Sequence, residues 1–184
     1  MSQRDSGYER KERDLYETPE WVTLALKPHL YEGIFHVWEP ACGSGKMVRA
    51  LESLGYGVHG TDLDAGADFL EQQAEPLAYE AIVTNPPYVL AQEFIEHALR
   101  QPVSVVAMLL RTDYDHAKSR LHLFDDERFS KKLVLTKRIK WFEDSKGQPS
   151  FNHAWYIWET AHRGAPTLAY GPRLALTSKL RGGE

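Results

Sequence analysis

The stretch Ala81-Ile82-Val83-Thr84-Asn85-Pro86-Pro87-Tyr88 joins a short apolar run to a polar turn. A run of this kind is typical of a strand that is buried on both faces of a parallel sheet. Each proline locks its own φ angle, and the second also restricts the residue before it. The stretch therefore predicts a buried strand that ends in a turn of fixed shape.

Similar runs recur along the chain, with helical spacing between several of them. We expect strands at 35–38, 56–61, 81–84, 103–110, 133–136 and 154–158. We expect helices at 18–30, 46–54 and 94–99. The first of these helices begins with Thr18 as its N-cap and Pro19 in its first turn. The alternation predicts an α/β domain with a mostly parallel sheet, whose last two strands can pair as an antiparallel edge.

Polar turns follow four of the expected strands. In an open α/β sheet, ligands bind in the crevice beyond the carboxyl ends of the strands. We therefore expect one site to collect the turns at 39–45, 62, 85–88 and 111–113.

Gly43 and Gly45 lie between an expected strand and an expected helix. Glycines there let the backbone approach a ligand closely, although a simple connection is the alternative. The spacing is not that of a phosphate-binding NTPase loop or of a full dinucleotide fingerprint. Asp62, at the end of the next strand, can accept hydrogen bonds from a ribose or can cap a helix.

Asp68 and Phe69 follow. The pair can receive an adenine amino group and cover the ring, or can be a surface carboxylate beside a core ring.

Asn85 begins the turn after the 81–84 strand. Its side-chain oxygen and the Pro86 carbonyl can accept both N–H bonds of one amino group, which turns the nitrogen lone pair toward an electrophilic methyl group. Methyl transfer is then a displacement that depends mainly on positioning. Pro87 holds the turn, and Tyr88 can stack on the target ring. The alternative is a rigid turn before a helix.

Composition limits the other classes of function. The 184 residues fit one domain, and the single cysteine, Cys42, cannot form an internal disulfide. No signal-peptide pattern or membrane span is visible, so we expect a cytoplasmic protein without membrane contact. The histidines lack metal-ligand spacing, so we expect no metal. The net charge of −4 argues mildly against indiscriminate nucleic-acid binding. A lysine-rich segment at 131–140 is either a local basic groove or a solvated face.

These residues resemble a known family. The chain is similar, over roughly residues 15–160, to class I, Rossmann-like methyltransferases of the DNA adenine-N6 type, including the short phage-type enzymes. The resemblance is carried by Tyr16-Glu17-Thr18-Pro19, Glu39-Pro40-Ala41-Cys42-Gly43-Ser44-Gly45, Asp62, Asp68-Phe69 and Asn85-Pro86-Pro87-Tyr88.

The resemblance implies a seven-stranded sheet with helices on both faces and S-adenosylmethionine as the cofactor. It implies that Asn85, Pro86, Pro87 and Tyr88 are catalytic. It implies cofactor contacts from Tyr16, Thr18, Pro19, Glu39, Ala41, Gly43, Gly45, Asp62, Asp68, Phe69 and Asn85. Phe151 is the candidate for an aromatic side chain that, with Tyr88, holds the target base, although Phe151 and Trp155 can equally be core residues.

The expected organisation is a flexible arm at 1–14, a methyltransferase domain at 15–163 and an irregular tail at 164–184. We expect no separate target-recognition domain, and a homodimer is one way to supply the missing nucleic-acid surface. The expected partner is nucleic acid, with DNA favoured. The alternatives are an RNA base methyltransferase, a protein glutamine methyltransferase and a non-catalytic partner subunit.

Overall fold

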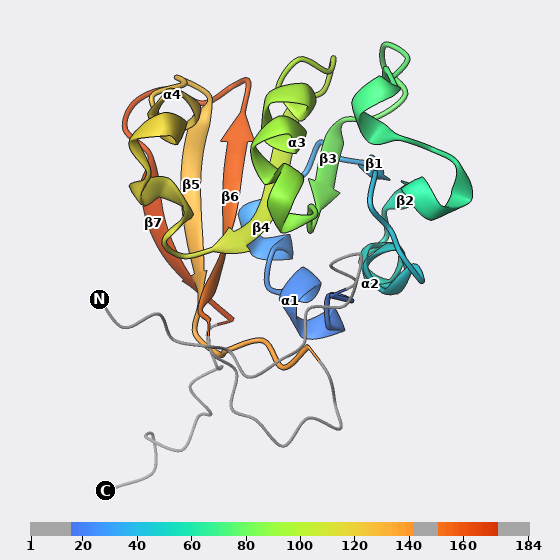
Figure 1. Cartoon of the computed structure of the whole chain (residues 1–184), viewed down its shortest axis with the longest axis horizontal. Coiled ribbons are helices and arrows are strands. Elements are labelled where there is room, and N and C mark those ends of the chain that lie inside the picture. Colours follow the sequence, from blue (N-terminus) through green and yellow to red (C-terminus); the bar gives the residue numbers. More distant parts are fainter. Residues whose placement is uncertain (1–15, 142–150, 173–184) are drawn as a thin grey trace, which may run out of the picture.

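A computed structural model describes residues 16–141 and 151–172. Its strands form one mixed sheet in the order β2-β1-β3-β4-β6-β5-β7 (Figure 1). The strands are β1 His36–Glu39, β2 Gly57–Gly60, β3 Ala81–Thr84, β4 Val105–Arg111, β5 Phe129–Leu135, β6 His153–Glu159 and β7 Thr167–Gly171. The expectation of a seven-stranded, mostly parallel sheet is confirmed.

Strand β6 is the antiparallel member of the sheet. It pairs with β4 through seven successive residues, from Val105 opposite Glu159 to Arg111 opposite His153, and with β5 on its other side. The last two expected strands, at 133–136 and 154–158, do pair in antiparallel fashion as β5 and β6, but the expectation that the antiparallel strand lies at an edge is wrong. All but the last residue of β6 are buried, and a strand without a polar face belongs inside the sheet.

Helices cover both faces of the sheet, as expected. The α-helices are α1 Glu20–Leu24, α2 Lys46–Ser53, α3 Ala91–Ala98 and α4 Leu121–Phe124. Short 3-10 helices are η1 Lys27–His29, η2 Leu63–Ala65, η3 Phe69–Glu71, η4 Tyr88–Leu90, η5 Tyr114–His116 and η6 Lys118–Arg120.

Two hydrophobic cores lie on opposite faces of the sheet. Alternate residues of β4 show the division, since Val105, Ala107 and Leu109 join the core beneath α1 and α2. Val106, Met108 and Leu110 join the core beneath α3 and α4. Figure 1 shows α3 in front of the central strands.

Helix α1 begins one residue later than expected. Pro19 occupies its N-cap position, without a side-chain cap, so the assignment of Thr18 as N-cap is wrong. The Pro19 carbonyl instead accepts the Val22 N–H at 3.0 Å. The Thr18 side chain is buried instead, with only 4 % of the residue exposed.

The expected irregular tail contains a strand. Residues 167–171 form β7, which pairs in parallel with β5, so this part of the expectation is wrong. The expected arm at 1–14 and residues 173–184 lie outside the described residues. No helix in the described part of the chain is long and apolar enough to cross a membrane.

Candidate active site

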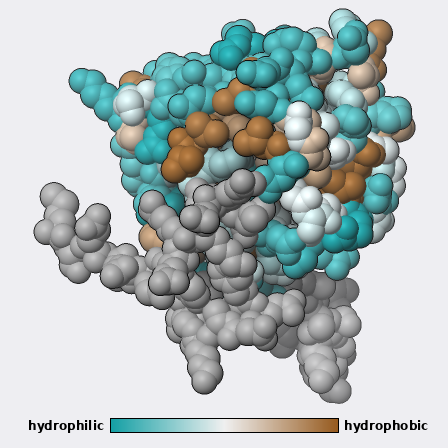
Figure 2. Space-filling view, turned by 45° about the vertical axis from the view of Figure 1, so that its right-hand side comes forward, coloured by the Kyte–Doolittle hydropathy of each residue, from teal (hydrophilic) through white to brown (hydrophobic). Residues whose placement is uncertain are grey.

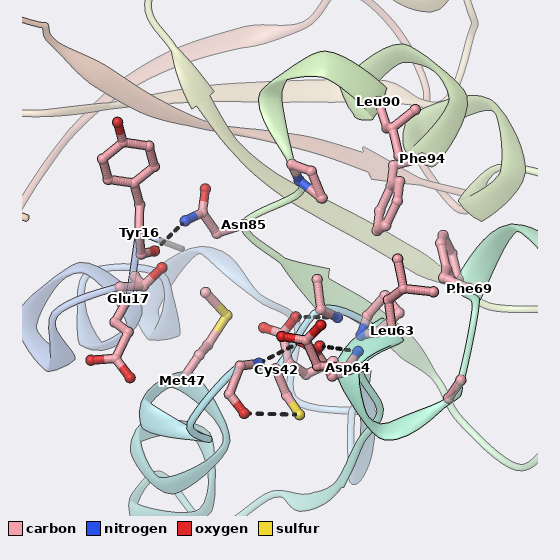
Figure 3. Close-up of a pocket in the computed structure, with 18 of the residues that line it drawn as sticks. Tyr16, Glu17, Cys42, Met47, Leu63, Asp64, Phe69, Asn85, Leu90 and Phe94 are labelled. Carbon is pink, nitrogen blue, oxygen red and sulfur yellow. Dashed lines mark hydrogen bonds between the residues drawn. The ribbon is translucent and has the colours of Figure 1, made fainter. Parts of the chain in front are cut away.

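A cavity of about 760 Å³ lies at the carboxyl ends of β1, β2 and β3 (Figure 3). This is the edge of the sheet at which the sequence predicts a ligand site. Ten of the expected site residues line the cavity: Tyr16, Thr18, Glu39, Ala41, Gly43, Asp62, Asp68, Phe69, Asn85 and Pro87. Five are not part of its wall: Pro19, Gly45, Pro86, Tyr88 and Phe151.

Asp62 connects the glycine-rich turn to the end of β2. One carboxylate oxygen accepts the Gly43 N–H at 2.8 Å, and the other accepts the Asp64 N–H at 2.9 Å. Gly43 and Gly45 have φ angles of 50° and 80°, in the left-handed region that favours glycine. Each Asp62 oxygen keeps a second lone pair, so the carboxylate can still accept a hydrogen bond from a ligand.

Glu39 ends β1 and is 1 % exposed. Its Oε1 atom accepts the Ala41 N–H at 3.1 Å, which aims the carboxyl group at the start of the glycine-rich turn. Burial raises the pKa of Glu39 to about 8, because the charged form loses hydration. A positively charged ligand in the cavity would favour the ionised carboxylate.

The cavity is acidic at one part of its wall and apolar at another. Among the described residues its lining includes five carboxylic acids and one lysine: Glu17, Glu39, Asp62, Asp64, Asp68 and Lys46. Lys46 pairs with Glu17 at 2.8 Å, and hydrogen bonds from Lys46 and Ser44 lower the pKa of Glu17. Figure 3 shows Phe69, Phe94 and Leu90 on the side away from Glu17. This distribution suits a ligand with a cationic part and an apolar ring.

Asp68 and Phe69 lie at the cavity and also have structural roles. The Asp68 carboxylate accepts the Leu70 N–H at 2.9 Å and so caps η3. Phe69 is 2 % exposed and packs edge-on against Trp38, with ring centroids 5.1 Å apart. Both residues nevertheless line the cavity, so structural support and ligand contact are compatible.

Asn85 is anchored through one atom of its side-chain amide. Its Nδ2 donates to the Tyr16 carbonyl at 3.0 Å, across 69 residues of sequence. Its Oδ1 is buried and has no hydrogen-bond partner among the described residues. Figure 3 shows this oxygen directed away from the Tyr16 carbonyl. An acceptor without a partner beside a cavity is suited to a ligand N–H group.

Tyr88 is half-buried and is not part of the cavity wall, and its hydroxyl is 2.9 Å from Nε2 of His153. The Arg111 guanidinium lies 3.9 Å from the centre of the Phe151 ring and also pairs with Asp113 at 2.7 Å. The 111–113 turn does not line the cavity, so the expectation that it joins the other three turns there is wrong. Trp155 is a core residue, with its indole N–H bound to the Val22 carbonyl at 3.0 Å.

Several wall residues were not expected. The cavity is also lined by Lys46, Met47, Leu63, Leu90 and Phe94, which no sequence motif indicated. Leu90 and Phe94 directly follow the rigid turn, and this proximity was the signal that could have identified them. Leu63 is 65 % exposed at the cavity, and Figure 2 shows hydrophobic patches on an otherwise largely hydrophilic face.

The lysine-rich segment is not one surface. Lys131 donates to the His29 carbonyl at 3.2 Å, whereas its neighbour Lys132 pairs with Asp115 at 2.6 Å. Neighbouring side chains of a strand point to opposite faces, so these two cannot share a groove. Within 16–141 and 151–172, no group of three His, Cys, Asp or Glu side chains could hold a metal ion.

Solved structures share this fold at low sequence identity. A protein from Listeria monocytogenes, named as a class I S-adenosylmethionine-dependent methyltransferase, matches with a TM-score of 0.58 and 13% identity over 81% of this chain. A type I restriction-modification methyltransferase subunit from Streptococcus thermophilus matches with a TM-score of 0.55 and 14% identity over 80%. A protein from Pyrococcus horikoshii, named as an RNA methyltransferase, matches with a TM-score of 0.54 and 17% identity over 76%.

The chain spans 62% of the Listeria protein, 45% of the Streptococcus subunit and 81% of the Pyrococcus protein. No protein-family model and no curated protein sequence matches it. The chain therefore has the fold of class I methyltransferases.

Proposed function

We propose that this protein transfers a methyl group from S-adenosylmethionine to the exocyclic N6 amino group of adenine in DNA. The main support for this proposal is the hydrogen bonding of the Asn85 side-chain amide. Its nitrogen is held by the Tyr16 carbonyl, and its buried oxygen is left without a partner among the described residues.

The cavity supports the choice of cofactor. S-adenosylmethionine carries a sulfonium and an ammonium group, and carboxylic acids outnumber lysine in the wall among the described residues. Glu17 and Glu39 are candidates for the ammonium group, and Asp62 for the ribose hydroxyls. Asp68, with the apolar wall of Phe69, is the candidate for the adenine of the cofactor.

The reaction needs little from the protein beyond positioning. When bound, S-adenosylmethionine would supply a methyl group on a positively charged sulfur. The target nitrogen would bond to the methyl carbon while the S–C bond breaks and leaves its electron pair on sulfur. The methylated nitrogen would then release a proton to water. Asn85 Oδ1 would accept one target N–H bond, and the Pro86 carbonyl the other. Pro86 and Pro87 keep these acceptors from rotating away.

The DNA substrate rests on the resemblance of the Asn85–Tyr88 motif and its cofactor segments. The similar type I restriction-modification subunit favours the same substrate class. In duplex DNA, the adenine would have to leave the base stack to reach Asn85, at a cost of a few kcal/mol.

The test separates cofactor binding from chemistry. Calorimetry should show S-adenosylmethionine binding to the wild type and strongly weakened binding to Asp62→Ala. Asn85→Ala should bind the cofactor within about twofold of the wild type and lose about 100-fold or more in methyl transfer, as for loss of a positioned hydrogen-bonding group. Absence of binding to the wild type, or an active Asn85→Ala enzyme, would refute the proposal.

A further inference from the structure

His153 contacts Tyr88 from a rigid part of the fold. It is the first residue of β6, it lies opposite Arg111 at the end of β4, and it is 1 % exposed. The 2.9 Å contact between its Nε2 and the Tyr88 hydroxyl joins residues that are 65 positions apart. The sheet therefore sets the position of the imidazole, and the imidazole limits where the Tyr88 hydroxyl can lie.

Two further rings complete an aromatic cluster of Tyr16, Tyr88, Trp141 and His153. Trp141 packs edge-on against His153, with centroids 5.1 Å apart, and lies 5.4 Å from Tyr16. Tyr16 lies 6.0 Å from Tyr88. The contacts form a closed ring, so one member cannot shift without disturbing its neighbours.

The aromatic cluster also reaches Asn85, because the Tyr16 carbonyl accepts the Asn85 Nδ2 hydrogen bond. Tyr16 thus contacts both groups, since its main-chain carbonyl holds the Asn85 amide and its ring packs against the Tyr88 ring. Burial and the nearby Arg111 lower the pKa of His153 to about 4, so the imidazole is neutral at physiological pH. A neutral imidazole can pair with a hydroxyl in either tautomer, since one nitrogen donates and the other accepts.

We infer that His153 is a positioning residue for methyl transfer: its hydrogen bond to the Tyr88 hydroxyl holds the Tyr88 ring in the orientation in which it stacks on the target base beside Asn85. His153 touches neither the cofactor nor the reacting atoms in this role. The inference rests on the proposed function, because it assigns Tyr88 to the target base.

The experiment is a double-mutant cycle on the full chain with S-adenosylmethionine and DNA. Tyr88→Phe removes only the hydroxyl, and His153→Phe removes the hydrogen bond but keeps a ring against Trp141. Each single variant should lower kcat/KM for DNA by about tenfold, the equivalent of one hydrogen bond of about 1.4 kcal/mol. Cofactor affinity should stay within about twofold, and the double variant should be no slower than the slower single variant.

His153→Gln keeps a side-chain hydrogen-bond donor and acceptor, and it should recover part of the lost rate when Tyr88 is intact but not when Tyr88 is Phe. If His153→Phe does not fold, the comparison of His153→Gln with and without the Tyr88 hydroxyl still tests the inference. If the losses in kcat/KM of the two single variants add in the double variant, His153 does not act through the Tyr88 hydroxyl. That result would overturn the inference, although the wild type would still be an active methyltransferase. An inactive wild type that binds no cofactor would instead remove the proposed function and this inference with it.

Discussion

The Asn85 side chain shows how one backbone contact can orient a reactive group. An amide can rotate by 180° and exchange its oxygen and nitrogen, but a carbonyl partner accepts only from the nitrogen. The Tyr16 carbonyl therefore selects the rotamer that leaves Oδ1 without a partner among the described residues. The sequence identified Asn85 from its motif, but the partner that orients it is 69 residues away and follows only from the fold.

Glu39 should make the stability of the protein depend on pH. Its folded-state pKa of about 8 lies above the ordinary value of 4.5, so the folded chain holds this proton over a range in which the unfolded chain has released it. The contribution of protonated Glu39 to the free energy of unfolding is complete below pH 4.5 and is lost as the pH rises through 8. We expect the free energy of unfolding in urea to fall between pH 6.5 and 8.5 in the wild type and to change less in Glu39→Gln.

Above pH 6.5 the effect of Glu39 on stability can be measured separately from that of His153. The lowered pKa of His153, about 4, has the opposite sign, since its contribution is present above pH 6.5 and is lost as the pH falls toward 4. Parallel pH curves for the wild type and Glu39→Gln above pH 6.5 would show that the carboxyl group is not buried in the way described.

Strand β6 is tied to helices on both faces by two indole groups, which offer a matched comparison. Trp155 donates to the Val22 carbonyl of α1, and Trp158 donates to the Leu123 carbonyl of α4 at 2.8 Å. Replacing either tryptophan by Phe leaves a buried carbonyl unpaired, so each variant should lose about 1–3 kcal/mol of unfolding free energy in urea. Helix α1 directly follows the Tyr16–Thr18 part of the cavity wall, whereas no residue of α4 lines the cavity.

Cofactor affinity should therefore distinguish the two variants. Calorimetry should show weaker S-adenosylmethionine binding in Trp155→Phe and unchanged binding in Trp158→Phe. Equal effects on binding would mean that α1 does not position the cavity segment.

The clearest sequence signals came from strands whose side chains are buried in the two cores. Strands β3 and β4 are buried along almost their whole length, and their apolar runs were visible. Strand β7 was missed because three of its five residues are exposed and no apolar pattern distinguishes it from a loop. Helix α4, at four residues, is too short for helical periodicity to appear.

Across the whole molecule, chain segments that meet at the site are far apart in sequence. Parallel strands bring their carboxyl ends to one edge, so the general position of the cavity was predictable. The placement of Tyr88 and Phe151 outside the cavity wall was not, because it depends on side-chain packing between β4, β6 and η4. The acidic character of the cavity was also not apparent from a net charge of −4.

Identification of the methylated product is the decisive experiment for this protein. Wild type and Asn85→Ala would each be incubated with methyl-labelled S-adenosylmethionine and mixed-sequence DNA, RNA or protein, and the products digested and analysed by mass spectrometry. We expect N6-methyldeoxyadenosine from DNA with the wild type and none with Asn85→Ala. Label on ribonucleosides or glutamine alone, label on carbon or oxygen, or an equal product from Asn85→Ala would contradict it.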